Sequence, residues 1–271
     1  MSEVVELHFS TEILKILLQD HTTGKNILWA TNDYEKISAE EEIQIEQLNL
    51  IQPRYKKIRE QQKSRTREKA EVFTPTFVCE LQNNAIDESF GEIFWQDYIS
   101  KTILEITCGE APYLANRYDA VTGEEIEIKN RVGMLDKKLK VICKTTSNET
   151  EWFDWALKAV QSIYGYEFQG DSLFLARLNI ISTVQEFFED KFKYSAPIGF
   201  LKEIAKIIAW NLWQMDGLTY TIPFHKIKSP QRGLKGFEEK KDKECEPCKV
   251  IDWKKNPDGD KKKFEYFIDW D

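Results

Sequence analysis

The stretch from Ile103 to Tyr118 constrains the fold more than any other part of this sequence. It begins with an apolar run at 103–106, which is interrupted by the carboxylate of Glu105. Gly109 then turns the chain, and Pro112 stands where a helix can begin, because the first helical turn tolerates proline. We therefore predict a short buried strand, a glycine-containing turn and a helix over this stretch.

Such a unit places free backbone N–H groups and a helix N-terminus at the carboxyl end of a parallel strand. Open α/β sheets bind nucleotides at this position. An ordinary connection between a strand and a helix explains the same residues, because a turn with one glycine is a weak signal. The stretch predicts an α/β fold and leaves both interpretations of the turn open.

A second informative stretch runs from Ile163 to Ile180. Residues 164–168 are typical of a strand, near whose end stands the carboxylate of Glu167, and residues 170–172 turn the chain into a helix over 173–188. An acidic residue at the end of the strand after a nucleotide-binding turn suits hydrogen bonds to ribose hydroxyls. A solvated loop carboxylate is the alternative.

The apolar spacing elsewhere predicts further elements. We expect a helix from Ser38, where Ser38–Glu41 fits a capping box. Other helices are expected at 10–19, 76–81, 87–98, 151–162 and 201–213, and strands at 218–224, 250–253 and 264–268. Residues 119–150 are interpreted as an insertion with one helix or strand near 135–141, and 226–248 as a Lys-rich loop. The chain then divides into an N-terminal helical extension, 1–69, and a main domain, 70–271.

The net charge of −8 argues against a protein that coats nucleic acid indiscriminately. Residues 54–69 are nevertheless locally basic, with eight Lys or Arg and two Glu in sixteen positions. Lys and Arg displace counterions from DNA, so phosphate contact is one explanation, and a solvated helix face is the other. The candidates for DNA contact are Arg54, Lys56, Lys57, Arg59, Lys63, Arg65 and Arg67.

Five cysteines without regular spacing suit a reducing cytoplasm better than a disulfide framework. The first residues lack the layout of a signal peptide, and no run of about 18 apolar residues exists, so we expect a cytoplasmic protein without a membrane partner. Cys245 and Cys248 are possible zinc ligands, but a structural zinc needs four, so we expect a simple loop and no metal. No Ser–His–Asp set or cluster of acids supports a hydrolase or nuclease.

Four stretches together resemble the adenine-specific DNA methyltransferases of restriction–modification systems, in their modification subunit. Residues 70–75, Ala-Glu-Val-Phe-Thr-Pro, are similar to the first cofactor motif of this family. Residues 104–110 resemble its strand and glycine turn, residues 164–167 with 175–179 its ribose-binding strand and following helix, and residues 211–217 its adenine-contacting turn. The resemblance covers roughly residues 53–225.

The resemblance implies a Rossmann-like class I methyltransferase fold, a mostly parallel sheet flanked by helices, with the helical extension before it. It implies S-adenosylmethionine as cofactor, double-stranded DNA as partner, and a restriction or specificity subunit as a further one. The cofactor-binding residues that it implies are Phe73, Thr74, Pro75, Glu105, Thr107, Cys108, Gly109, Glu110, Glu167, Phe168 and Asp216.

The sequence departs from this family at two places. Ala111-Pro112 stands where a second glycine is usual, and the Asn/Asp-Pro-Pro-aromatic motif that contacts the flipped adenine is missing. Asp252 and Trp253 are conceivable catalytic substitutes. Two functions therefore stay open: an adenine-specific DNA methyltransferase, or a catalytically inactive methyltransferase-like module that binds cofactor, DNA or a partner subunit. A small-molecule methyltransferase is disfavoured by the basic segment and the motif order.

Overall fold

A three-stranded parallel sheet lies at the centre of the computed structural model, which describes residues 9–57, 74–227 and 243–270. Its strands are β3 (Ile103–Glu105), β4 (Ile163–Glu167) and β5 (Leu212–Gln214), in that spatial order. The chain is therefore of the α/β class, as the sequence predicts. The two strands expected from the glycine-turn and ribose stretches are neighbours.

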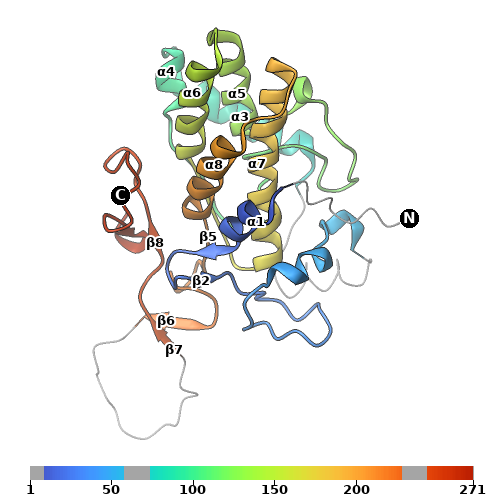
Figure 1. Cartoon of the computed structure of the whole chain (residues 1–271), viewed down its shortest axis with the longest axis vertical. Coiled ribbons are helices and arrows are strands. Elements are labelled where there is room, and N and C mark those ends of the chain that lie inside the picture. Colours follow the sequence, from blue (N-terminus) through green and yellow to red (C-terminus); the bar gives the residue numbers. More distant parts are fainter. Residues whose placement is uncertain (1–8, 58–73, 228–242, 271) are drawn as a thin grey trace, which may run out of the picture.

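Two pairs of helices connect the three strands. Helices α5 (Met134–Thr145) and α6 (Glu149–Gln161) join β3 to β4, and α7 (Gly170–Phe192) and α8 (Ile198–Asn211) join β4 to β5. Helix α5 contacts α6 and α7, and α8 contacts α6 and α7. The helices accordingly pack on one another as a bundle (Figure 1).

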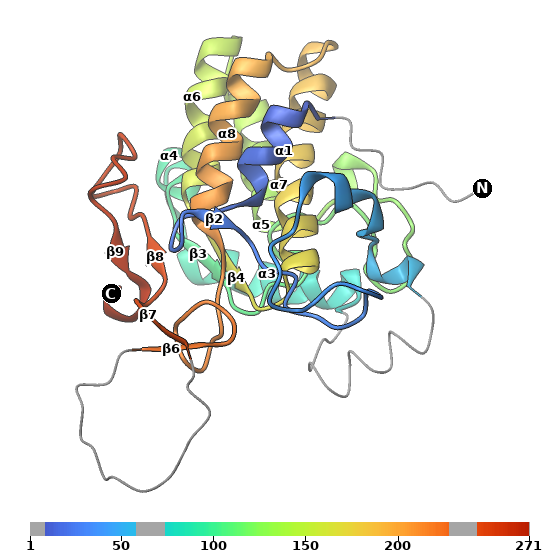
Figure 2. The same cartoon turned by 60° about the horizontal axis from the view of Figure 1, so that its bottom comes forward.

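The helix expected at 10–19 is α1 (Thr11–Leu18), which joins this bundle. The Ser10 side chain caps it by accepting a hydrogen bond from the backbone N–H of Ile13. The apolar face of α1 is buried against α7 and α8, and Figure 2 shows α1 beside α8. The start of the N-terminal extension therefore belongs to the main apolar core.

The two faces of the sheet bury different apolar clusters. Ile163 and Leu212 face the helices and belong to the large cluster, whereas Tyr164 and Trp213 belong to a smaller cluster with Val250. Strand residues alternate between faces, so this division follows from the sequence of β4 and β5. The chain after residue 243, red in Figure 2, supplies the cover for the second face.

The remaining elements are short, apart from α3. They are β1 (Gln19–Asp20), β2 (Lys25–Asn26), η1 (Ile45–Leu50), η2 (Arg54–Lys56), α3 (Thr76–Phe90), α4 (Trp95–Ile99), η3 (Ile128–Asn130), β6 (His225–Ile227), β7 (Lys243–Cys245), β8 (Lys249–Val250), β9 (Glu265–Tyr266) and η4 (Phe267–Asp269). Among the helices of the described residues, none is long and apolar enough to cross a bilayer.

The prediction of a helix that begins at Pro112 is wrong. Turns continue after Gly109, and the next α-helix begins at Met134. The carbonyl oxygen of Tyr113 is engaged elsewhere, because it accepts a hydrogen bond from the side-chain amide of Asn83. A tertiary contact with α3 therefore competes with helix formation at this point.

The helix expected at 87–98 is divided between the end of α3 (Thr76–Phe90) and α4 (Trp95–Ile99). Two other expected elements are also wrong. The Glu41 side chain does accept from the N–H of Ser38, but no α-helix follows, and the chain forms η1 further on. The strand expected at 218–224 is a turn region, and β5 lies earlier, within the helix expected at 201–213. Helix α8 ends at Asn211, whose side-chain amide donates to backbone carbonyls beside β4.

Arg177 on α7 joins three of these elements inside the core. It is fully buried, and its guanidinium donates to four backbone carbonyl oxygens, those of Leu17, Gln19, Ala209 and Leu212. The carbonyls of Leu17 and Gln19 lie at the C-terminus of α1, that of Ala209 lies near the C-terminus of α8, and that of Leu212 belongs to the first residue of β5. One side chain therefore satisfies two helix C-termini that would otherwise be buried without donors.

We expect Arg177→Met to lower the free energy of unfolding by about 4 kcal/mol, because it leaves several buried carbonyls unsatisfied. Urea denaturation followed by circular dichroism measures this loss. Lys206→Met, which removes an exposed positive charge from α8, is the matched control. A loss below about 1 kcal/mol for the Arg177 variant would show that these contacts do not hold the bundle to the sheet.

Candidate functional site

A strained turn follows β3 at the carboxyl end of the sheet. Thr107, Gly109 and Ala111 have φ angles of +46°, +54° and +60°. The left-handed conformation costs a residue other than glycine about 1–2 kcal/mol. Strained backbone persists where its surroundings fix it, and it is frequent at ligand sites. The turn is therefore the first candidate for a functional element.

The carboxylate of Glu167, at the end of β4, lies directly against this turn. Its Oε2 accepts a hydrogen bond of 2.9 Å from the N–H of Gly109, and its Oε1 accepts one of 3.0 Å from the N–H of Gln169. The N–H of Cys108 donates to the carbonyl oxygen of Tyr166. The structure thus brings the glycine turn and the acidic strand end together.

Two buried oxygens at this edge have no hydrogen-bond partner in the described part of the chain. They are Oε2 of Glu105 and Oε1 of Gln169, whereas Oε1 of Glu105 accepts a long hydrogen bond of 3.4 Å from the N–H of Tyr113. Buried polar atoms are rarely left unpaired in folded proteins, so each such atom calls for a physical explanation. A polar ligand with donor groups is one explanation.

The Glu105 carboxyl is also unusual in its ionisation. Its pKa is raised to about 8, first because burial removes the carboxylate from water and further because the negative charge of Glu167 is near. Glu105 as a residue is half-buried, but the oxygen without a partner is fully buried. The raised pKa favours the protonated form of this carboxyl, which can donate as well as accept.

Other predicted cofactor residues have structural partners. Glu110 is buried; one of its carboxylate oxygens accepts from the N–H of Arg54 at 2.9 Å and the other from the hydroxyl of Tyr118. Cys108 is buried as well, and burial raises the pKa of its thiol well above the usual value. The side chain of Cys108 is therefore a neutral packing group and not a nucleophile.

The remaining predicted cofactor residues on either side of the glycine turn are Phe73, Thr74, Pro75 and Phe168. The side chain of Thr74 lies near that of Tyr113, whose N–H donates to Glu105, so Thr74 is close to the same edge. Pro75 precedes α3, and Phe73 lies outside the described residues. The Phe168 ring packs edge-on against Phe224.

Asp216 follows β5 and closes a local turn, in which its carboxylate accepts a 2.8 Å hydrogen bond from the N–H of Leu218. It lies after the third parallel strand, at the same carboxyl edge as Glu167, because the strands are parallel. No contact between Asp216 and the glycine turn is found among the described hydrogen bonds.

The structure does not bring Asp252 and Trp253 to this edge. The indole N–H of Trp253 donates to the side-chain oxygen of Asn211 at 2.6 Å, and the carbonyl of Ile251 accepts from the hydroxyl of Tyr164. Asn211 and Tyr164 lie at the amino ends of β5 and β4. The two proposed catalytic substitutes are therefore at the opposite end of the sheet from Gly109 and Glu167.

The basic segment is divided in the structure. Lys57 is buried and forms a 2.9 Å ion pair with Asp171, and Arg54 is buried. Lys56 lines an open groove beside α7. Arg59, Lys63, Arg65 and Arg67 lie outside the described residues. Of the described candidates for DNA contact, Lys56 alone has a side chain that a phosphate can reach.

For Cys245 and Cys248, the possible zinc ligands, the described residues provide no further ligand side chains nearby. Cys248 is buried with its sulfur 3.4 Å from the carbonyl oxygen of Gln214, and burial raises the pKa of its thiol well above the usual value. Within the described ranges, no three His, Cys, Asp or Glu side chains are placed to hold a metal ion. Cys245 instead lines a cavity.

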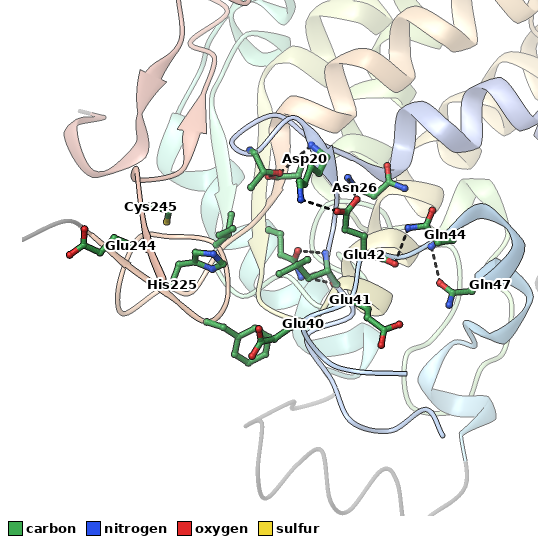
Figure 3. A pocket seen from close by; sticks show the side chains of 16 residues that line it. Asp20, Asn26, Glu40, Glu41, Glu42, Gln44, Gln47, His225, Glu244 and Cys245 are labelled. Carbon is green, nitrogen blue, oxygen red and sulfur yellow. Dashed lines mark hydrogen bonds and ion pairs between the residues drawn. The ribbon is translucent and has the colours of Figure 1, made fainter. Parts of the chain in front are cut away.

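That cavity, of about 700 Å³, was not anticipated from the sequence (Figure 3). It lies beside the carboxyl end of β5, between the N-terminal extension and the chain around Phe224. Its lining residues come from three segments that are far apart in the sequence. They are Asp20, Thr23, Lys25, Asn26, Leu28, Glu40, Glu41, Glu42, Gln44, Gln47, Gln214, Ile222, Phe224, His225, Glu244 and Cys245.

The extension is fixed to the sheet edge by backbone contacts that the sequence analysis also missed. The side chain of Gln214 exchanges two hydrogen bonds with the backbone of Leu28, and the N–H of Gly170 donates to the carbonyl of Trp29. A Cβ atom at Gly170 would lie 1.9 Å from the carbonyl oxygen of Leu28. The glycine at the first position of α7 was therefore a signal of this close approach.

Comparison with known proteins gives no relative of this chain: no family model, no curated protein and no solved structure matches it.

The strain in the turn predicts the effect of a glycine substitution. We expect Thr107→Gly to raise the free energy of unfolding by about 0.5 kcal/mol, because glycine adopts a positive φ without a steric cost. Thr107 is exposed, so little packing is lost. Thr102→Gly, at an exposed position without a positive φ, should instead be destabilising. Equal effects of the two changes in urea denaturation would contradict the strained turn.

The raised pKa of Glu105 predicts a pH dependence of stability. The folded state holds this proton more tightly than the unfolded state, so the contribution is fully present below pH 4.5 and is lost as the pH rises through about 8. Glu105→Gln should flatten the decline of the unfolding free energy between pH 5 and 8. Glu80→Gln, on the exposed side of α3, should leave the decline unchanged. Parallel curves for wild type and Glu105→Gln would refute the assignment.

Proposed function

We propose that this chain binds S-adenosylmethionine at the carboxyl edge of β3 and β4, as the methyltransferase-type module of a restriction–modification system. The observation that supports this most is the contact between the strained glycine turn and the buried carboxylate of Glu167 on adjacent parallel strands. Ligands of open α/β sheets bind at this edge. The order of the sequence motifs agrees with the proposal.

The unpaired oxygens support a ligand that carries hydroxyl groups, which can donate to Gln169 Oε1 and accept from the protonated carboxyl of Glu105. Glu105 Oε2 and Gln169 Oε1 are buried without partners in the described part of the chain, and both belong to the edge that Glu167 closes. The ribose hydroxyls of S-adenosylmethionine can both donate and accept. When bound, this cofactor supplies an activated methyl group on its sulfonium.

Each residue then has a defined task. Glu167 accepts hydrogen bonds from ribose hydroxyls, in exchange for one of the backbone N–H groups that it binds in the free protein. The protonated Glu105 positions the polar end of the ligand. The turn from Thr107 to Ala111 lets the backbone approach the ligand closely, and its strain is fixed by the surrounding packing.

Methyl transfer to the exocyclic amino group of adenine is the second candidate function. It needs a polar acceptor and an aromatic ring beside the methyl donor. The position of Asp252 and Trp253 at the opposite end of the sheet favours a binding module over transfer by these two residues. We propose that a partner restriction or specificity subunit provides the missing contacts to double-stranded DNA.

Titration calorimetry with S-adenosylmethionine tests the proposal. We expect micromolar binding, weakened about tenfold in Glu167→Gln, because the loss of one hydrogen bond to a charged acceptor costs about 1.4 kcal/mol. Glu203→Gln, on the exposed side of α8, is the matched control. Absence of binding by the wild-type chain would end the proposal.

Transfer of tritiated methyl to a mixed-sequence duplex separates the two candidates. The binding module alone should give no transfer. Transfer by the isolated chain that Asp252→Ala abolishes would instead establish the methyltransferase and make that carboxylate part of it.

A further inference from the structure

The 700 Å³ cavity beside β5 is separate from the edge that Glu105 and Glu167 form, since neither residue lines it (Figure 3). Its volume lies in the range of sites for small molecules. Three apolar side chains, those of Leu28, Ile222 and Phe224, contribute to its wall. An apolar wall with polar groups around it is the usual composition of a ligand pocket.

The polar groups around this wall are mainly hydrogen-bond acceptors. Five of the sixteen lining residues are acidic, and Lys25 is the one Lys or Arg among them. The ammonium of Lys25 lies 3.4 Å from the carboxylate of Glu42, so it neutralises part of one of these charges only. The cavity therefore presents a negative potential to a ligand.

His225 adds a further acceptor. Its Nδ1 lies 2.8 Å from the carbonyl oxygen of Pro223, and a carbonyl can only accept, so Nδ1 carries the proton of the neutral ring. The other nitrogen, Nε2, is then an acceptor. Figure 3 shows His225 on one side of the cavity and Glu42 on another, with Glu40 below and Asp20 above.

These acidic residues differ in their exposure to solvent and in their hydrogen bonds. Asp20 is buried, and its carboxylate already accepts from the N–H and hydroxyl of Thr23. Glu40 is an exposed residue at the rim, and Glu42 is half-buried beside Asn26. Glu40 and Glu42 therefore contribute to the charge that an entering ligand meets, together with the exposed Glu41 and Glu244.

From this composition we propose that the cavity binds an aliphatic diamine or polyamine. Ammonium groups are donors with positive charge, and they match carboxylates and an imidazole acceptor placed on several sides. The methylene chain between them matches the wall of Leu28, Ile222 and Phe224. Phosphates and other anions are excluded by like charge. The inference does not depend on the binding of S-adenosylmethionine at the other edge.

Titration calorimetry of the full chain with spermidine, putrescine and butane-1,4-diol at fixed ionic strength tests this proposal. We expect saturable one-to-one binding of spermidine, weaker binding of putrescine, and none of the uncharged diol. The double variant Glu40→Gln/Glu42→Gln should weaken spermidine binding about tenfold, since each partly exposed charge contributes up to about a factor of five.

The double variant Glu35→Gln/Glu46→Gln is the matched control. It removes the same charge from the same segment, and neither residue lines the cavity. Equal weakening by the two double variants would overturn the proposal, because it would mark spermidine as a general counterion. Undiminished binding by Glu40→Gln/Glu42→Gln, or competition by MgCl₂ as strong as that by putrescine at equal ionic strength, would overturn it as well.

Discussion

The position of the sheet depends on one buried guanidinium, that of Arg177. Burial of a positive charge is costly unless its donors are all engaged. Here the N–H groups of Arg177 donate to carbonyl oxygens at the C-terminus of α1, near the C-terminus of α8 and at the first residue of β5. Burial lowers the pKa of Arg177 to about 10, so the side chain remains charged at neutral pH. The helical bundle and β5 therefore have one fixed relative position.

The same contact brings the N-terminal extension into the fold. Once α1 is fixed by Arg177, the chain after it reaches the carboxyl edge of the sheet, where Leu28 pairs with the side chain of Gln214. Further along, Lys57 pairs with Asp171 and Arg54 donates to Glu110. The extension therefore contributes to both the cavity and the surroundings of the glycine turn.

The sequence predicted those parts of the fold that depend on local patterns. The strand that ends at Glu167 and the helices at 151–162 and 173–188 are confirmed, because apolar spacing and flanking turns determine them. The helix expected at Pro112 and the strand expected at 218–224 are wrong. In both regions a contact between distant residues influences the local structure. Asn83 binds Tyr113, and Asn211 binds the start of β4. The periodicity of apolar residues gives no information about such contacts.

The candidate site was predictable to a similar extent. Gly109 and Glu167 lie close together because they follow two adjacent parallel strands. The sequence motifs around each strand were enough to predict this contact. The cavity beside β5 was not predictable, because Glu42, Gln214 and His225 come from distant segments. The burial of Lys57 was not predictable either, since its partner Asp171 lies 114 positions away.

The two ends of the sheet differ in how completely their buried polar groups are satisfied. At the amino end, the buried ammonium of Lys138 donates to the carbonyls of Ile99 and Lys101 and to the hydroxyl of Ser162, and burial lowers its pKa to about 7. All three donors of this group are used.

At the carboxyl end, Glu105 and Gln169 keep buried oxygens without partners in the described part of the chain. Since an unpaired buried polar atom costs about 1–3 kcal/mol, a ligand that hydrogen-bonds with it gains that free energy on binding. Binding at the carboxyl edge is therefore favoured over binding at the amino edge, where Trp253 and Asn211 already satisfy each other.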